Sequence, residues 1–143
     1  MEQAKNISDA EMVIMRVIWA LKKARVDEIV SQISKRQKWS KATVKTLLGR
    51  LVKKKILKTK KDGRAFIYYS VVTEDEIIQF LSINLMEKIC ETKHSLVILE
   101  NIKQAKLTES DVAVLKKELF KKERVGNIQC SCLDNYCQDC QHK

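Results

Sequence analysis

The chain has 143 residues, of which 45% are hydrophobic and 32% are charged. This mixture is typical of a folded globular protein rather than a disordered one, and no apolar run approaches the roughly 18 residues that cross a membrane. The first residues show no basic stretch followed by an apolar one, so we expect a soluble, cytoplasmic protein without a membrane partner. In that reducing compartment, clustered cysteines bind metal or do redox work more often than they form disulfides.

The positive charge is concentrated in the first half of the chain. Residues 1–72 contain 18 Lys and Arg against 6 Asp and Glu, whereas residues 73–143 contain 10 against 12. The net charges are therefore +12 and −2. This asymmetry suggests a polyanion-binding module joined to a module with another task. The alternative is a lysine-rich surface that only keeps the protein hydrated.

Two helices are expected at the start of the chain. The stretch Ser8-Asp9-Ala10-Glu11 has the form of a capping box and predicts a helix that runs to about Lys23. Its broad apolar face contains Met12, Met15, Val17, Ile18, Trp19 and Leu21. A shorter helix is predicted from Asp27 to about Lys35, with Ile29, Val30 and Ile33 inward.

A third helix is predicted to begin after Ser40, whose side chain can cap it. Its apolar positions recur at helical spacing and are Val44, Leu47, Leu48, Leu51 and Val52. The other faces hold Lys41, Thr43, Lys45, Thr46, Arg50 and Lys53. The pattern indicates a helix that is apolar on its inner face and basic on its outer face.

A strand-like run from Ile56 to Lys61 is separated from another, Arg64 to Val72, by the pair Asp62-Gly63. Such a pair predicts a hairpin, because Gly tolerates the positive φ that tight turns need. Three helices followed by a hairpin is the order of a winged helix-turn-helix, in which the third helix enters the DNA major groove and the hairpin is the wing. Lys and Arg would then neutralise phosphates.

The remaining pattern up to residue 126 is helical. Thr73-Glu74-Asp75-Glu76 is another capping box, and three apolar series follow it. They are Ile77, Ile78, Phe80, Leu81, Leu85, Met86 and Ile89; then Leu96, Val97, Leu99 and Ile102; then Val112, Leu115, Leu119 and Phe120. Three apolar helices without a sheet to cover them suggest a twofold homodimer, which would present two recognition helices to one palindromic site. An ordinary core within one chain is the alternative.

Four of the five cysteines form the pattern C-x-C-x4-C-x2-C, at Cys130, Cys132, Cys137 and Cys140. Four thiolates on a short segment suit a closed tetrahedral Zn²⁺ site, and soft thiolates also suit Cu(I). A redox dithiol and an unstructured thiol tail are the alternatives. His142 could add a supporting ligand. Cys90 and His94 could share a helical face as ligands, or as a thiol and its base, but Cys90 follows an apolar face and is expected to be a small buried hydrophobe.

Several of these residues carry a resemblance to a known family. The stretch 39–48, WSKATVKTLL, followed by Arg50-Leu51 and later by Tyr68-Tyr69-Ser70, resembles the recognition helix and wing end of the BlaI/MecI/CopY family of bacterial repressors. Cys90 to His94 and the cysteine-rich tail are similar to the copper-responsive CopY branch. The β-lactam-responsive branch lacks the thiol tail and is inactivated by cleavage at an Asn-Phe pair, whereas Asn101 is followed here by Ile102.

The resemblance implies a mainly α (α+β) fold and a repressor that is not an enzyme. It would have a winged helix DNA-binding domain at 1–72, a helical dimerisation region at 73–126 and a Cys-rich metal-binding tail at 127–143. The Zn²⁺-loaded homodimer would cover a pseudo-palindromic operator of copper homeostasis genes. Cu(I) would displace the zinc and release the DNA, and a copper chaperone that delivers Cu(I) is a candidate partner.

Matched positions imply which residues face DNA. On the recognition helix they are Ser40, Lys41, Thr43, Lys45, Thr46 and Arg50, and on the wing Lys60 and Arg64. Thr43 and Thr46 would contact bases and the basic residues phosphates. The chain departs from the family pattern at Lys53-Lys54-Lys55, where Gly is frequent after the basic pair, so the helix is expected to end differently. It also departs in the tail, where Cys140 lies one residue late relative to C-x-C-x4-C-x-C.

A second function remains open at this point. The tail could be a zinc module that binds a protein partner, on a DNA anchor that does not sense copper. An enzyme that uses the thiols as a redox catalyst would need turnover with a reductant, and no active-site constellation accompanies them.

Overall fold

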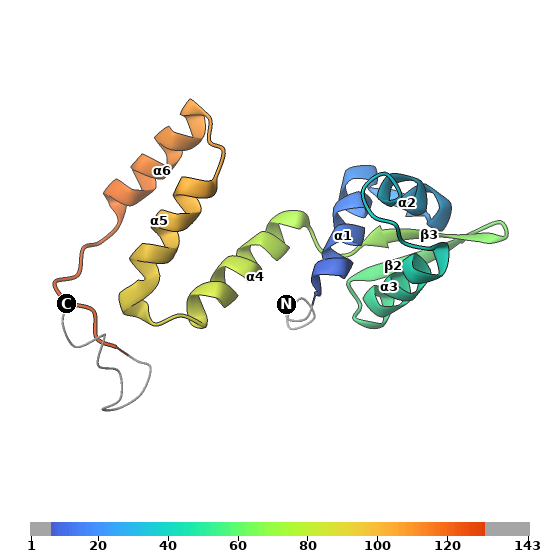
Figure 1. Ribbon diagram of the computed structural model, residues 1–143, viewed down its shortest axis with the longest axis horizontal. Coiled ribbons are helices and arrows are strands. Elements are labelled where there is room, and N and C mark those ends of the chain that lie inside the picture. Colours follow the sequence, from blue (N-terminus) through green and yellow to red (C-terminus); the bar gives the residue numbers. More distant parts are fainter. Residues whose placement is uncertain (1–6, 131–143) are drawn as a thin grey trace. The chain divides into compact units, whose positions relative to one another are not determined.

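The chain divides into two compact units, Met1–Ser82 and Ile83–Lys143, and the computed structural model describes residues 7–130. The first unit contains three complete helices, three strands and the first part of a fourth helix (Figure 1). In chain order the complete elements are α1 (Asp9–Leu21), β1 (Lys23–Arg25), α2 (Val26–Ile33), α3 (Lys41–Lys53), β2 (Leu57–Asp62) and β3 (Ala65–Ser70). This order confirms the predicted winged helix, with β1 as an additional short strand.

Helix α1 begins as the sequence predicts. The Ser8 hydroxyl accepts from the Glu11 amide at 3.3 Å, and the Glu11 carboxylate accepts from the Ser8 amide at 2.8 Å, which completes the capping box. The helix ends at Leu21 rather than at about Lys23, because Lys22 has a φ of 65° and Lys23 begins β1. A strand of three residues is too short for its period to be visible in the sequence.

The sheet is antiparallel, with the strand order β1-β3-β2. Asp62 pairs with Ala65, so the hairpin loop consists of Gly63 and Arg64, one residue later than the predicted Asp62-Gly63 pair. Gly63 has a φ of 63°, and a positive φ at the first loop position alone is the pattern of a type II′ turn, which favours Gly there. The hairpin prediction is confirmed, and its tip extends past the helices (Figure 1).

The three helices pack on one another around an apolar core, with α1 also against β3 and α3 against β2. The buried residues are Ile14, Met15, Ile18, Ala24, Ile29, Ile33, Val44, Leu47, Leu48, Leu51, Ile56 and Leu57. The indole of Trp19 donates to the carbonyl of Val72 at 3.0 Å and so ties the end of the wing to α1. This core fixes the orientation of α3, which carries most of the predicted DNA contacts.

Helix α3 ends in a Schellman motif although no Gly is present. The Lys55 amide donates to the Val52 carbonyl at 2.9 Å and the Ile56 amide to the Leu51 carbonyl at 3.0 Å. Lys55 has a φ of 58°, so a lysine occupies the left-handed position that usually favours Gly. Ile56 and Leu51 are both fully buried, which supplies the apolar contact that accompanies this motif.

Beyond β3 the described chain is helical. The elements are α4 (Glu74–Glu87), the 3₁₀ helix η2 (Glu91–Lys93), α5 (His94–Gln104) and α6 (Glu109–Lys121). The Thr73 and Thr108 hydroxyls cap α4 and α6. Among residues 7–130, no helix is both long and apolar enough to cross a membrane. The boundary between the two units falls within α4, and the predicted division at Val72 and at residue 126 stays a prediction.

Candidate nucleic-acid interface and metal site

The outer face of α3 is fixed by its buried face. Val44, Leu48 and Leu51 are fully buried, so the opposite side of the helix points to solvent. All eight residues predicted to face DNA are exposed, six of them on α3 or its cap: Ser40, Lys41, Thr43, Lys45, Thr46, Arg50, Lys60 and Arg64. Ser40 accepts from the Thr43 amide at 3.1 Å and starts the helix there. The remaining amides of the first turn can bind a phosphate.

One cation of this face has a partner within the protein. Lys41 forms an ion pair with Asp27, near the start of α2, and both side chains are more than half exposed. The hydrogen bond from Lys41, and then the charges of Lys41 and Lys45, lower the pKa of Asp27. Exposed ion pairs are weak, so a DNA phosphate can replace Asp27 as the partner of Lys41.

The two threonines predicted to read bases already make local contacts. The Thr46 hydroxyl donates to the carbonyl of Ala42 at 3.0 Å, and the hydroxyls of Ser40 and Thr43 lie 3.0 Å apart. With its proton used in this way, the Thr46 oxygen offers lone pairs to a base amino group, and its methyl can contact a thymine methyl. The bond to Ala42 also holds the side chain in one orientation.

The register of the sheet places four cations on one face. Lys23, Tyr69 and Lys58 lie opposite one another, as do Arg25, Ile67 and Lys60 two residues away along the strands. Opposite residues share a face of the sheet, and the face alternates along each strand. Of these cations, only Lys60 was predicted from the sequence, because β1 was not predicted. The alternation of Lys58 and Lys60 along β2 is the signal that could have revealed Lys58.

The hairpin tip is tied back to β1 by an exposed ion pair between Arg25 and Asp62. The hydrogen bond and the charge of Asp62 raise the pKa of Arg25. Arg25 is therefore partly neutralised, whereas Lys60, on β2, and Arg64, in the loop, are exposed near the tip. This arrangement is suited to contacts with a phosphate backbone.

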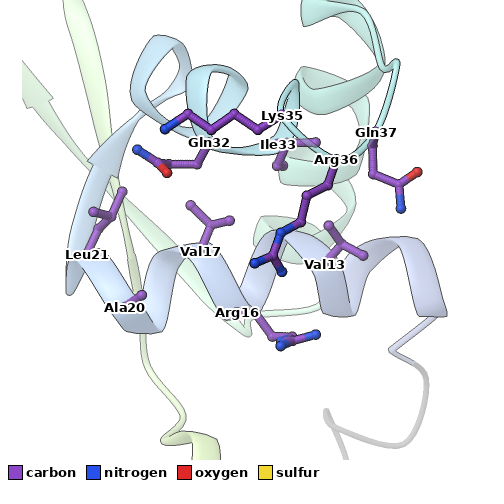
Figure 2. A pocket seen from close by; sticks show the side chains of 10 residues that line it. All are labelled: Val13, Arg16, Val17, Ala20, Leu21, Gln32, Ile33, Lys35, Arg36 and Gln37. Carbon is purple, nitrogen blue, oxygen red and sulfur yellow. The ribbon is translucent and has the colours of Figure 1, made fainter.

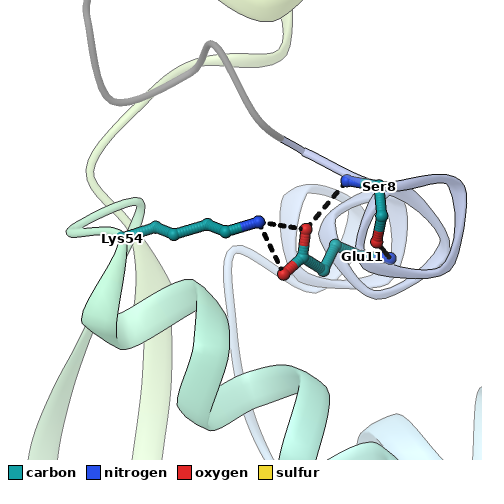
Figure 3. A network of polar contacts seen from close by, with 3 residues as sticks. All are labelled: Ser8, Glu11 and Lys54. Atoms are coloured by element: carbon teal, nitrogen blue, oxygen red, sulfur yellow. Dashed lines mark hydrogen bonds and ion pairs between the residues drawn. The ribbon is translucent and has the colours of Figure 1, made fainter.

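A buried ion pair anchors the C-terminal end of α3 (Figure 3). Lys54 lies 2.7 and 2.9 Å from the two carboxylate oxygens of Glu11, whose side chain is 1% exposed. Burial would raise the pKa of Glu11, but the bonds from Lys54 and from the Ser8 amide outweigh it and the pKa lies below its usual value. Of the three consecutive lysines, Lys54 thus serves the fold, and Lys53 and Lys55 remain exposed.

A surface hollow of about 540 Å³ lies between α1 and the end of α2 (Figure 2). Its lining is mixed, with Val13, Val17 and Leu21 beside the cations Arg16 and Arg36. None of the eight residues predicted to contact DNA lines it. The hollow is therefore separate from the predicted DNA-binding face.

The predicted metal ligands lie at the edge of the described chain. Cys130 is its last residue, whereas Cys132, Cys137, Cys140 and His142 lie outside the described residues. Within residues 7–130, no group of three or more His, Cys, Asp or Glu is arranged to hold a metal ion. The Cys130 sulfur lies 3.4 Å from that of Cys90, so the structure brings together two thiols that are 40 residues apart.

Cys90 is not the buried hydrophobe on the α4 face that the sequence suggested. It lies after the end of α4, caps η2 and is partly exposed. The helical face that Cys90 could have shared with His94 does not form either, because Cys90 precedes the helical turn whereas His94 begins α5. The His94 Nε2 atom lies 2.9 Å from the carbonyls of Met86 and Ile89, so this ring closes the end of α4.

Comparisons with known proteins show which family the chain resembles. The family model of the penicillinase repressor matches residues 7–121. An uncharacterized 16.5 kDa protein in the ptsI 3′ region of Latilactobacillus sakei is 33% identical over 142 residues, 98% of this chain and 97% of its own length. The methicillin resistance regulatory protein MecI of Mammaliicoccus sciuri is 34% identical over 117 residues, 82% of this chain and 95% of its own. A solved CopR repressor structure is 60% identical and covers 47% of this chain and 97% of its own, with a TM-score of 0.42.

The family match includes all six elements of the winged helix together with α4, α5 and α6. It ends before Cys130, the first of the four clustered cysteines. The exposed basic helix, the wing and the match over most of the chain lead to the same conclusion. The chain belongs to the penicillinase repressor (BlaI/MecI/CopY) family of DNA-binding transcriptional repressors, which are not enzymes.

Proposed function

We propose that the chain represses copper homeostasis genes as a Zn²⁺-loaded homodimer on a pseudo-palindromic operator, and that Cu(I) binding to the tail thiolates releases it. The observation that carries the proposal is the position of the cysteines. The family match ends at residue 121, and the four clustered thiols begin at residue 130. A metal-binding input is thus added to a repressor body that the family shares.

The donor set fits the proposed metals. Cys130, Cys132, Cys137 and Cys140 supply four thiolates, and Zn²⁺ with four such ligands is a closed structural site. Thiolates also prefer Cu(I) to harder ions. A bound metal would cross-link the parts of the sequence that carry these four cysteines. The four cysteines supply the negative charge that balances the metal ion, because each thiol loses its proton to solvent when it binds the metal.

The proposal of a homodimer is supported by the apolar side chains of α5 and α6. Leu96, Ile98 and Leu99 are about half exposed, and Leu119 and Phe120 are 74% and 84% exposed. Among the described residues from 83 to 130, no side chain is buried. Apolar surface of this extent marks an interaction site in a stable protein. A second copy would cover it and would place two α3 helices on one operator, about 34 Å apart.

The switch requires only a coupling free energy between the tail and the DNA-binding dimer. Cu(I) does not have to touch DNA; it has to favour a tail arrangement that the DNA-bound dimer does not adopt. If Cu(I) weakened operator binding a hundredfold, the coupling free energy would be about 2.7 kcal/mol. By reciprocity, operator DNA would weaken Cu(I) binding by the same factor.

The experiment uses the full chain and an operator that the zinc-loaded protein selects from a random duplex library. Fluorescence anisotropy then measures operator affinity at fixed salt with added Zn²⁺ and with added Cu(I) under anaerobic conditions. We expect Cu(I), but not Zn²⁺, to weaken binding at least tenfold. A variant with Cys137→Ser and Cys140→Ser should lose the response to Cu(I). Undiminished operator affinity at saturating Cu(I) would contradict the copper switch and favour a zinc module that binds a protein partner.

Base reading by Thr46 is tested with the same operator and a random duplex. Thr46→Ala should weaken operator binding by about 1–2 kcal/mol and leave binding to the random duplex unchanged, since a base contact contributes only where the base is correct. Lys45→Ala is the matched comparison, and it should weaken both duplexes equally and reduce the salt dependence. An equal loss on both duplexes for Thr46→Ala would exclude base reading by this side chain.

A further inference from the structure

The contact between Cys90 and Cys130 joins the tail to the connection between α4 and α5. The two sulfurs are 3.4 Å apart, which is well beyond the roughly 2.05 Å of a disulfide bond. Two thiolates bound at about 2.3 Å to one tetrahedral ion lie about 3.8 Å apart. At 3.4 Å the Cys90 thiol donates a hydrogen bond to the Cys130 sulfur, and a small movement would bring the two sulfurs to the separation of a shared ion.

The position of Cys90 is set by several hydrogen bonds. The Lys93 amide donates to the Cys90 carbonyl at 2.8 Å, and the preceding carbonyl, that of Ile89, contacts the His94 ring at 2.9 Å. The Thr92 hydroxyl lies 3.2 Å from the Cys90 sulfur. A thiol on backbone that is held in this way is preorganised for binding, so less conformational entropy is lost when it takes a ligand.

We propose that Cys90 and Cys130 are thiolate ligands of one metal ion. The inference rests on the proposed metal-binding function of the tail. An ion bound by Cys130 is within reach of Cys90, because the two sulfurs are 3.4 Å apart. On binding, the S–H bond of Cys90 breaks, a sulfur–metal bond forms and the proton passes to solvent, with no change of oxidation state.

This ligand would give the metal a direct connection to the helical region. Without Cys90, an ion in the tail would order only residues after α6. With Cys90, the same ion would cross-link the tail to the turn between α4 and α5, so exchange of one metal for another would act on the helices proposed to form the dimer. The effect of a metal exchange would then reach the helices through metal–sulfur bonds rather than through contacts of the tail alone.

The test is alkylation of the full-length chain under reducing, anaerobic conditions, with each cysteine followed by mass spectrometry. On addition of Zn²⁺, we expect the alkylation rate of Cys90 to fall at least tenfold, together with those of the tail cysteines. In the variant with Cys137→Ser and Cys140→Ser, Zn²⁺ should no longer protect Cys90. Tail cysteines that are protected while Cys90 reacts at its metal-free rate would overturn the inference and leave the proposed function intact. Failure of Zn²⁺ to protect any cysteine would instead overturn both.

A second measurement compares metal affinities by competition with a chromophoric chelator. Cys90→Ser should weaken Zn²⁺ binding at least tenfold. Ser95→Ala is the matched control, because it removes a hydroxyl at an exposed position of the neighbouring helix α5 without removing a thiolate, and it should change the affinity less than twofold. Circular dichroism of both variants shows whether the helices are retained. Equal affinities of Cys90→Ser and the wild type would exclude Cys90 as a ligand.

Discussion

The two units of the chain differ in how they bury apolar side chains. The first encloses a core of twelve buried residues contributed by three helices and a sheet, whereas no residue between 83 and 130 is buried. Both segments have apolar residues at helical spacing, so the periodicity alone does not distinguish them. The difference shows that the same sequence pattern can specify a core within one chain or a surface that needs a partner. The predictions below test this distinction.

The largest effect is expected from a cavity in the first core. Leu48→Ala should lower the free energy of unfolding of the first unit by about 2–5 kcal/mol, because Leu48 is fully buried. Leu115→Ala should cost less than about 0.5 kcal/mol in the monomer, because Leu115 is 45% exposed. Hydrogen exchange followed by mass spectrometry at high dilution measures both. Equal losses of unfolding free energy for the two variants at that dilution would show that the second unit has a core of its own.

The next effect concerns association. Phe120→Glu should weaken the proposed dimer about a hundredfold, or about 2.7 kcal/mol, because a charge would replace an aromatic side chain that is 84% exposed in the single chain. Ser110→Glu adds the same charge at an exposed position of α6 and should leave the dimer intact. Sedimentation equilibrium gives the two dissociation constants. Equal constants for both variants would exclude this end of α6 from the interface.

The ion pairs of the two units also differ in burial: the pair between Glu11 and Lys54 is largely buried, whereas the pair between Glu118 and Lys121 is exposed. Glu11→Gln should destabilise the first unit by about 2 kcal/mol at pH 7, because Lys54 would lose the carboxylate of a largely buried pair. Glu118→Gln, which removes an exposed pair with Lys121, should change nothing measurable. Thermal unfolding of each variant provides the comparison. A loss for Glu118→Gln as large as that for Glu11→Gln would contradict the distinction.

The pH dependence follows from the direction of the Glu11 shift. Because the folded pKa of Glu11 lies below its usual value, its contribution to stability is complete above about pH 4.3 and is lost as the pH falls through the folded pKa. The stability curves of wild type and Glu11→Gln should therefore converge in acid. Curves that stay parallel from pH 7 to pH 3 would show that the charge of Glu11 does not contribute.

The sequence predicted the helices and strands that have a regular apolar pattern over many residues or a capping residue at their start. Ser8, Ser40 and Thr73 marked helix starts that the structure confirms, and Asp62-Gly63 marked the hairpin within one residue. The sequence could not show β1, which exists only because β3 offers it hydrogen bonds. The same is true of the Cys90–Cys130 contact, since nothing local in the chain specifies a pair 40 residues apart.

Gly49 provides the smallest effect and a test of the outer face of α3. It lies on the same helical row as Ala42 and Thr46, opposite the buried Val44 and Leu48, and a Cβ there would meet nothing within 4 Å. Gly costs a helix interior about 1 kcal/mol relative to Ala, and no neighbour within the described residues requires its small size. Close approach of DNA to the backbone would require it.

Gly49→Ala should therefore raise the stability of the first unit by up to about 1 kcal/mol and yet weaken operator binding about tenfold. Gly126→Ala adds a methyl where there is also open space, but after α6, and should leave operator affinity unchanged. Thermal unfolding and fluorescence anisotropy give the two quantities for each variant. A more stable Gly49→Ala protein with full operator affinity would show that the backbone of α3 does not approach DNA at this position, and that contacts there are made by longer side chains alone.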